Sequence, residues 1–192
     1  RFLARESKLS EESRKERLIH LWPFFIWNAS AAYFNFWRLT GYKKKLLNAK
    51  AENFIIPPHD YQFGTKVVSF SEREDFQSLP NLFYHFYINF IEKTENEYPF
   101  LKQEAIWNYI FSGLINVEGE EHGVKILVQF KYELEKAKYF PDKEIITEKL
   151  QLFLEKLDTV GFMPKPLYFA IKRFIRWKEL NTKASKEAQA QM

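Results

Sequence analysis

One uncharged, ring-rich stretch near the start of the chain constrains the fold most. Residues 18–37 read LIHLWPFFIWNASAAYFNFW and contain no Asp, Glu, Lys or Arg. Basic residues stand on both sides, at positions 14, 15 and 17 and again at 38 and 43–45. Burying so many aromatic rings releases more free energy than an exposed loop could retain. The stretch is therefore expected to have an apolar partner: the chain's own core, a membrane interface or another protein.

The length of residues 18–37 is sufficient to cross a bilayer, which takes about 20 apolar residues. The composition suits a span poorly, because aliphatic content is low and Pro23, Asn28 and Asn35 interrupt it. Trp and Tyr favour the headgroup region over the bilayer centre. An interfacial helix fits better than a span. A helix that continues from the charged residues 1–17 into this stretch is expected.

The composition excludes several kinds of site. Cysteine is absent from the 192 residues, so disulfides, thiolate metal sites and cysteine nucleophiles are excluded. The chain has only six glycines and carries no P-loop, G-x-G-x-x-G or G-x-S-x-G motif. The hydrophobic fraction of 46% is sufficient for a sizeable core. The net charge of +4 permits contact with anionic lipid or nucleic acid without requiring it.

Helical periodicity dominates from Ser78 onward. Ser78 is predicted to cap a helix that ends in the charged residues 94–97, and Pro99 suits a first helical position before a stripe at 107–114. Residues 124–140 alternate like a strand but also fit a helix, which the composition favours. The clearest helix is 142–158, with Asp142 as its cap and Gly161 as its end, and a last helix is expected at 167–180.

The segments between these helices are expected to be irregular. Residues 41–50 are predicted to form a basic turn and a short helix, and residues 119–123 an acidic turn. Residues 52–75 are predicted to be an arm extended by Pro57 and Pro58, with one short strand at 66–70. The fold class predicted is mainly α: an irregular helical subunit with an extended Pro-containing arm and at most a short strand pair. The predicted segments are 1–50, 51–77, 78–180 and a polar tail at 181–192.

The four histidines give weak signals for chemistry. The acidic residues Glu118, Glu120 and Glu121 beside His122 form the densest carboxylate–imidazole cluster, but a solvated turn is preferred to a metal site because Glu118 and His122 are four residues apart and no Glu-x-x-His pair occurs. The His59-Asp60 pair is interpreted as a turn, and His85 as a partly buried, hydrogen-bonded structural histidine. No catalytic residue, metal or cofactor is predicted.

The last predicted helix combines an apolar face with basic residues. Its charges and Trp177 could contact phosphates and bases or anionic lipid headgroups, or could simply be a solvated face. Together with the ring-rich stretch it completes the predicted partner- or lipid-binding set: Trp22, Phe24, Phe25, Trp27, Phe34, Trp37, Lys43, Lys44, Lys45, Lys172, Arg173, Arg176 and Trp177.

Two functions fit this pattern. The first is a non-enzymatic accessory or structural subunit of a larger, membrane-associated complex, bound to other protein subunits and to lipid headgroups at the mitochondrial inner membrane or its surface. A start at Arg-Phe-Leu instead of Met suits a removed organellar leader, and equally a trimmed sequence. The alternative is a nucleic-acid-binding or ribosome-associated helical protein, based on the basic clusters at 14–17, 43–45 and 172–178.

Overall fold

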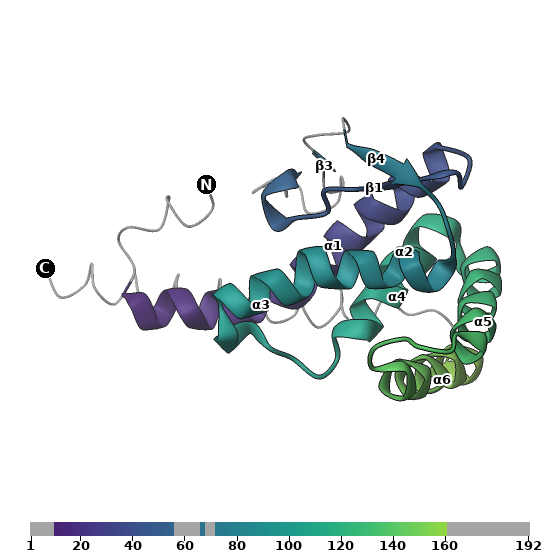
Figure 1. The fold of residues 1–192 in the computed structure, drawn as a ribbon. Coiled ribbons are helices and arrows are strands. Elements are labelled where there is room, and N and C mark those ends of the chain that lie inside the picture. Colours follow the sequence, from purple (N-terminus) through teal and green to yellow (C-terminus); the bar gives the residue numbers. More distant parts are fainter. Residues whose placement is uncertain (1–9, 56–65, 68–71, 161–192) are drawn as a thin grey trace, which may run out of the picture. The chain divides into compact units, whose positions relative to one another are not determined.

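In the computed structural model of the protein, the described residues are 10–55, 66–67 and 72–160 (Figure 1). They belong to two compact units. The larger unit is Phe25–Met163, and residues 10–24 belong to the other. The predicted boundaries at 50 and 77 fall inside the larger unit, and the boundary at 180 lies outside the described residues.

Helices make up most of the described chain, so the predicted mainly α class is confirmed. The helical elements are α1 (Glu11–Leu39), η2 (Ala51–Asn53), α2 (Leu79–Phe86), the π-helix η3 (Tyr87–Glu92), α3 (Lys93–Glu97), η4 (Pro99–Leu101), α4 (Ile106–Glu118), α5 (Glu120–Lys136) and α6 (Lys143–Val160). The strands are β1 (Lys44–Leu46), β2 (Phe54–Ile55), β3 (Lys66–Val67) and β4 (Arg73–Asp75). Among described residues they form two short antiparallel pairs, β1 with β4 and β2 with β3.

Helix α1 runs without a break from the charged segment through the ring-rich stretch, as expected. Ser10 Oγ accepts a hydrogen bond from the Ser13 amide at 3.2 Å, which satisfies one free N–H of the first turn. Glu11 and Glu12 stand in the same turn, where the helix dipole favours negative charge. Pro23 lies inside the helix. Because an interior proline disfavours a helix, tertiary packing must offset its effect.

The core of the larger unit is built around the second half of α1. Tyr33 and Phe34 are completely buried. The Phe34 ring packs 4.8 Å from Phe83 of α2, and Phe83 stacks at 4.3 Å on Phe130 of α5. Phe111 of α4 packs 6.1 Å from Phe83. Of the three expected partners, the chain's own core is therefore the one that covers this part of the stretch.

The predicted short helix within 41–50 is wrong. Gly41 and Tyr42 turn the chain with φ of 65° and 63°, and β1 follows. Lys44 pairs with Asp75 across the strands, in register with Leu46 opposite Arg73. The strand is more stable here than a short helix, because its residues gain ladder hydrogen bonds and tertiary contacts that an isolated helical turn cannot supply.

The predicted strand at 66–70 is observed at Lys66–Val67, where β3 pairs with β2, and residues 68–71 lie outside the described part. The Ser78 cap is confirmed, since its side chain accepts a hydrogen bond from the Asn81 amide. The helix it opens passes through the π-helix η3 and ends at Glu97, as predicted. Pro99 begins only the short turn η4.

The predicted acidic turn at 119–123 is wrong. Gly119, with φ of 78°, ends α4, and α5 begins at the next residue. Glu120 and Glu121 occupy the first turn of α5, where the helix dipole favours carboxylates. The helix preferred for 124–140 is confirmed as far as Lys136. The helix predicted at 142–158 is confirmed as α6, preceded by Asp142, whereas Gly161 and the helix at 167–180 lie outside the described residues.

Candidate functional site

The predicted aromatic binding residues do not form an exposed surface in this structure. Phe25 is half-buried, and the other five are buried: Trp22, Phe24, Trp27, Phe34 and Trp37. Trp37, for example, packs 4.8 Å from the Tyr42 ring and 5.3 Å from the Phe76 ring. Apart from Phe25, these rings are therefore covered within the structure, and contact of these residues with a partner stays a prediction. Among the described residues, no helix has an apolar stretch that could cross a membrane.

The predicted basic residues 43–45 have three different environments. Lys43 is exposed, and Lys44 pairs with the exposed carboxylate of Asp75. Lys45 is buried, lies 3.1 Å from Glu74 Oε2 and donates a hydrogen bond to Asn81 Oδ1 of α2. Its charge therefore fastens β1 to β4 and α2 instead of facing a ligand. The other predicted basic-helix residues, Lys172, Arg173, Arg176 and Trp177, lie outside the described residues.

His85 is the structural histidine that its position predicts. Its Nδ1 lies 3.3 Å from Tyr33 Oη, and the Tyr33 hydroxyl donates to the Leu82 carbonyl at 3.3 Å. Burial, followed by the nearby positive charge of Lys45, lowers the pKa of His85 to about 4. A neutral imidazole therefore bridges α1 and α2 at neutral pH. His20 is exposed, and His59 lies outside the described residues.

The cluster around His122 is a polar contact between elements. His122 Nε2 lies 3.5 Å from Glu118 Oε2, which also accepts a hydrogen bond from the Tyr42 hydroxyl at 2.8 Å. Burial and the Glu118 carboxylate raise the pKa of Tyr42. Within the described ranges, no three His, Asp or Glu side chains come together as metal ligands.

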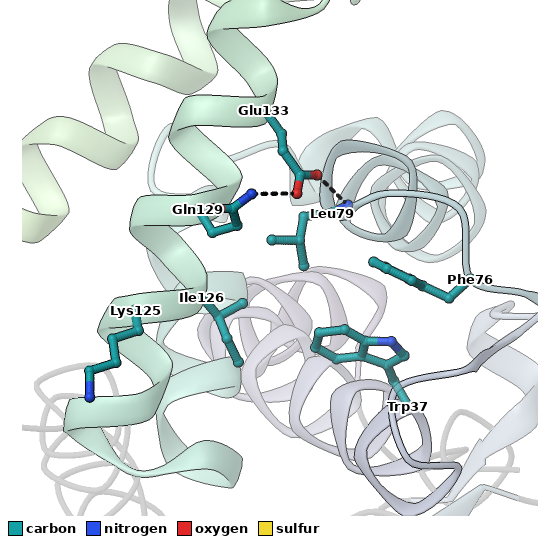
Figure 2. A pocket seen from close by; sticks show the side chains of 7 residues that line it. All are labelled: Trp37, Phe76, Leu79, Lys125, Ile126, Gln129 and Glu133. Atoms are coloured by element: carbon teal, nitrogen blue, oxygen red, sulfur yellow. Dashed lines mark hydrogen bonds between the residues drawn. The ribbon is translucent and has the colours of Figure 1, made fainter.

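A shallow groove lies between α5 and the elements that precede it (Figure 2). It has a volume of about 340 Å³ and is lined by Trp37, Phe76, Leu79, Lys125, Ile126, Gln129 and Glu133. Glu133 Oε2 accepts a hydrogen bond from the Leu79 amide at 2.9 Å, and Glu133 Oε1 accepts one from Gln129 Nε2 at 2.9 Å. Because Glu133 is engaged with its neighbours, the carboxylate acts as a helix cap for α2.

The groove offers little apolar surface to a ligand. Its floor residues Trp37, Leu79 and Ile126 are each less than 10% exposed, so covering them again removes little area from water. Figure 2 shows Lys125 directed away from the aromatic floor. The groove alone is therefore a weak candidate for a binding site.

Exposed apolar side chains occur outside the buried stripes of α5 and α6 and in the loop that joins the two helices. Five large apolar side chains in this part of the chain are between 41% and 95% exposed. This set is called the α5–α6 face: Val128, Tyr132, Tyr139, Ile145 and Leu152. Lys131, three residues after Val128, donates a hydrogen bond to Gln151 Oε1 at 2.6 Å, next to Leu152. The bond joins α5 and α6 close to these exposed residues.

Sequence reasoning missed the α5–α6 face, although a signal was present. On α5 the buried residues are Gly123, Ile126, Leu127, Phe130 and Leu134. Val128 and Tyr132 project from the opposite side of a helix with 3.6 residues per turn. Ile145 and Leu152 likewise fall outside the stripe that buries Ile146 and Leu150. Apolar residues left over after the core stripe is assigned therefore mark this face.

Comparison of the chain with protein-family models, with curated proteins and with solved structures finds no match.

Proposed function

We propose that the protein is a non-enzymatic structural subunit that binds another protein through the α5–α6 face. The observation that carries this proposal is that, among described residues, five of the eight exposed large hydrophobic residues lie between positions 128 and 152, on α5, on α6 and in the loop that joins them. Clusters of exposed apolar residues typically mark contact surfaces for other macromolecules.

The charges around this face favour a protein over a polyanion as its partner. Acidic and basic side chains alternate along α5 and α6, and the exposed ones include Glu121, Lys125, Glu135, Lys136, Glu144, Glu148, Glu155 and Lys156. Nucleic acid and anionic membranes instead attract surfaces with a clear excess of Lys and Arg. A mixed-charge border around aromatic and aliphatic side chains is typical of a protein interface.

The free energy available on this face is adequate for a specific contact. Fully covering a half-exposed large apolar side chain contributes roughly 1 kcal/mol. Tyr139, at 95% exposure, offers the most area. The predicted mitochondrial inner-membrane location and the predicted lipid contacts stay predictions, because the described residues lend them no specific support. The burial of Lys45 removes one charge from the basic clusters on which the nucleic-acid alternative rests.

A photo-cross-linking residue at position 145 or 152 tests the proposal in the native source. The same residue at position 116, which is exposed on α4, is the matched control. We expect both α6 positions, and not the control, to cross-link one and the same protein. That protein, once identified and purified, is expected to bind the chain and to lose binding to Leu152→Glu but not to Asn116→Glu. Equal cross-linking from all three positions, or none from α6, contradicts the proposal.

A further inference from the structure

The exposed side of α5 carries a regular stripe of side chains. Its members are spaced alternately by four and three residues, and all are exposed: Glu121, Lys125, Val128, Tyr132 and Glu135. This alternation is the heptad spacing that keeps one helix in contact with another at a crossing angle of about 20°. The stripe lies opposite the buried side of the same helix, so it is available to a second helix.

The stripe is complementary to itself when two copies run antiparallel. A two-fold axis that passes the exposed side of α5 at the level of residue 130 places Val128 opposite Tyr132 of a second copy. The same axis places Lys125 opposite Glu135. Each apolar residue then meets an apolar residue, and each cation meets a carboxylate. The two charged positions are separated by ten residues, or about 15 Å of helix, and frame the apolar pair.

The ion pairs that Lys125 and Glu135 form within one chain do not oppose the formation of ion pairs between two chains. Lys125 Nζ lies 2.7 Å from Glu121 Oε1, and Glu135 Oε1 lies 3.8 Å from Lys131 Nζ. Lys125, Glu121 and Glu135 are more than half exposed in these pairs. Exposed pairs of this kind contribute little to stability, so replacing them by contacts across an interface costs little.

We infer that α5 binds α5 of a second copy of this chain in an antiparallel, two-fold symmetric pair. The inference rests on the proposed binding role of the α5–α6 face and assigns the α5 side of that face to self-association. An isologous contact of this kind is the commonest route to a homodimer. Because a single helix pair buries less than a standard interface, the dimer is weak and concentration-dependent.

Sedimentation of the purified full chain over a concentration series up to about 1 mM tests the inference. We expect the wild type to form a dimer and Lys125→Glu or Glu135→Lys to weaken it roughly tenfold or more, since each reversal creates two repulsive contacts. Lys102→Glu, the same charge change on an exposed residue before α4, is expected to leave the dimer unchanged.

Two further samples make the test specific for antiparallel pairing. The double variant Lys125→Glu/Glu135→Lys restores both contacts, and an equimolar mixture of the two single variants forms a mixed dimer. A wild type that stays monomeric over the whole series, or a double variant as weak as the single ones, overturns the inference. If self-association fails while residues 145 and 152 still cross-link a different protein, the proposed function stands without it.

Discussion

Gly113 of α4 lies directly against Ser30 of α1. A Cβ at position 113 would come 1.9 Å from Ser30 Oγ, 2.9 Å from the Trp27 carbonyl oxygen and 3.0 Å from the Ala31 amide nitrogen. Ser30 Oγ donates to the Trp27 carbonyl at 2.9 Å, so the hydroxyl is held in this position. The close approach of the two backbones brings the ring-rich half of α1 into the core of the larger unit.

Gly113→Ala is therefore expected to destabilise the protein by about 1–3 kcal/mol, because the added methyl group must push the two helices apart. Asn116→Ala, an exposed change on the same helix, is expected to stay within about 0.5 kcal/mol of wild type. Urea unfolding measures both. Adding Ser30→Ala is expected to relieve only part of the loss, since the backbone contacts to α1 remain. A Gly113→Ala variant as stable as wild type contradicts the close packing.

We expect the protein to lose stability in mild acid because of the lowered pKa of His85. Its pKa in the folded protein, about 4, is below the ordinary value of about 6.5, so between these values the unfolded chain binds the proton and the folded chain does not. The contribution of His85 to the free energy of unfolding is therefore fully present above pH of about 6.5 and is lost as the pH drops towards 4. After a discount for partial exposure of the ring, the loss is roughly 1–2 kcal/mol.

The measurement for His85 is urea unfolding at several pH values. His85→Gln is expected to remove most of the slope between pH of about 6.5 and 4, whereas His122→Gln, a change of an exposed histidine, retains it. Equal slopes in wild type and His85→Gln would show that this imidazole is not held neutral by the fold.

We expect Glu133 to stabilise the protein by capping the N-terminus of α2. Glu133→Ala removes the acceptor of the Leu79 amide and is expected to cost about 0.5–2 kcal/mol. Glu133→Gln retains an acceptor oxygen and is expected to cost less. Glu135→Gln, two positions away and exposed, is expected to have little effect. Thermal unfolding in low salt ranks the three variants, and an alanine variant that melts with wild type argues against the cap.

We expect Lys45, one of the basic residues near the ring-rich stretch, to stabilise the folded protein. Lys45→Met leaves the Asn81 side chain without its donor and the Glu74 carboxylate without its partner, at a cost of about 1–3 kcal/mol. Lys44→Met, in an exposed pair with Asp75, is expected to cost less than about 1 kcal/mol. Chemical denaturation measures the free energy of unfolding of both variants. Similar losses of stability would contradict the structural role of the buried Lys45.

The sequence predicts a helix well where one periodic stripe decides it, as in α6. In α5 a strand-like alternation competes with the helical stripe, and helix-forming composition favours the correct choice only from residue 124 onward. It fails at residues 41–50, because the pairing of Lys45 with Glu74 depends on a segment about 30 positions away. It also places rings such as Phe34 in a partner- or lipid-binding set, because composition measures apolar area and does not show which helices cover it. The buried ring contacts Phe34–Phe83 and Phe83–Phe130 are long-range and have no local signal.

The central claim is that the rings of α1 form core and that the contact surface lies on α5 and α6. Acrylamide quenching of tryptophan fluorescence without detergent tests it most directly, in a Trp177→Phe variant that leaves only Trp22, Trp27, Trp37 and Trp107. All four are less than 10% exposed. We expect emission that is shielded from acrylamide and unchanged by detergent or lipid vesicles. Strong quenching that detergent or lipid suppresses would show that these rings are an attachment surface, and would contradict the account.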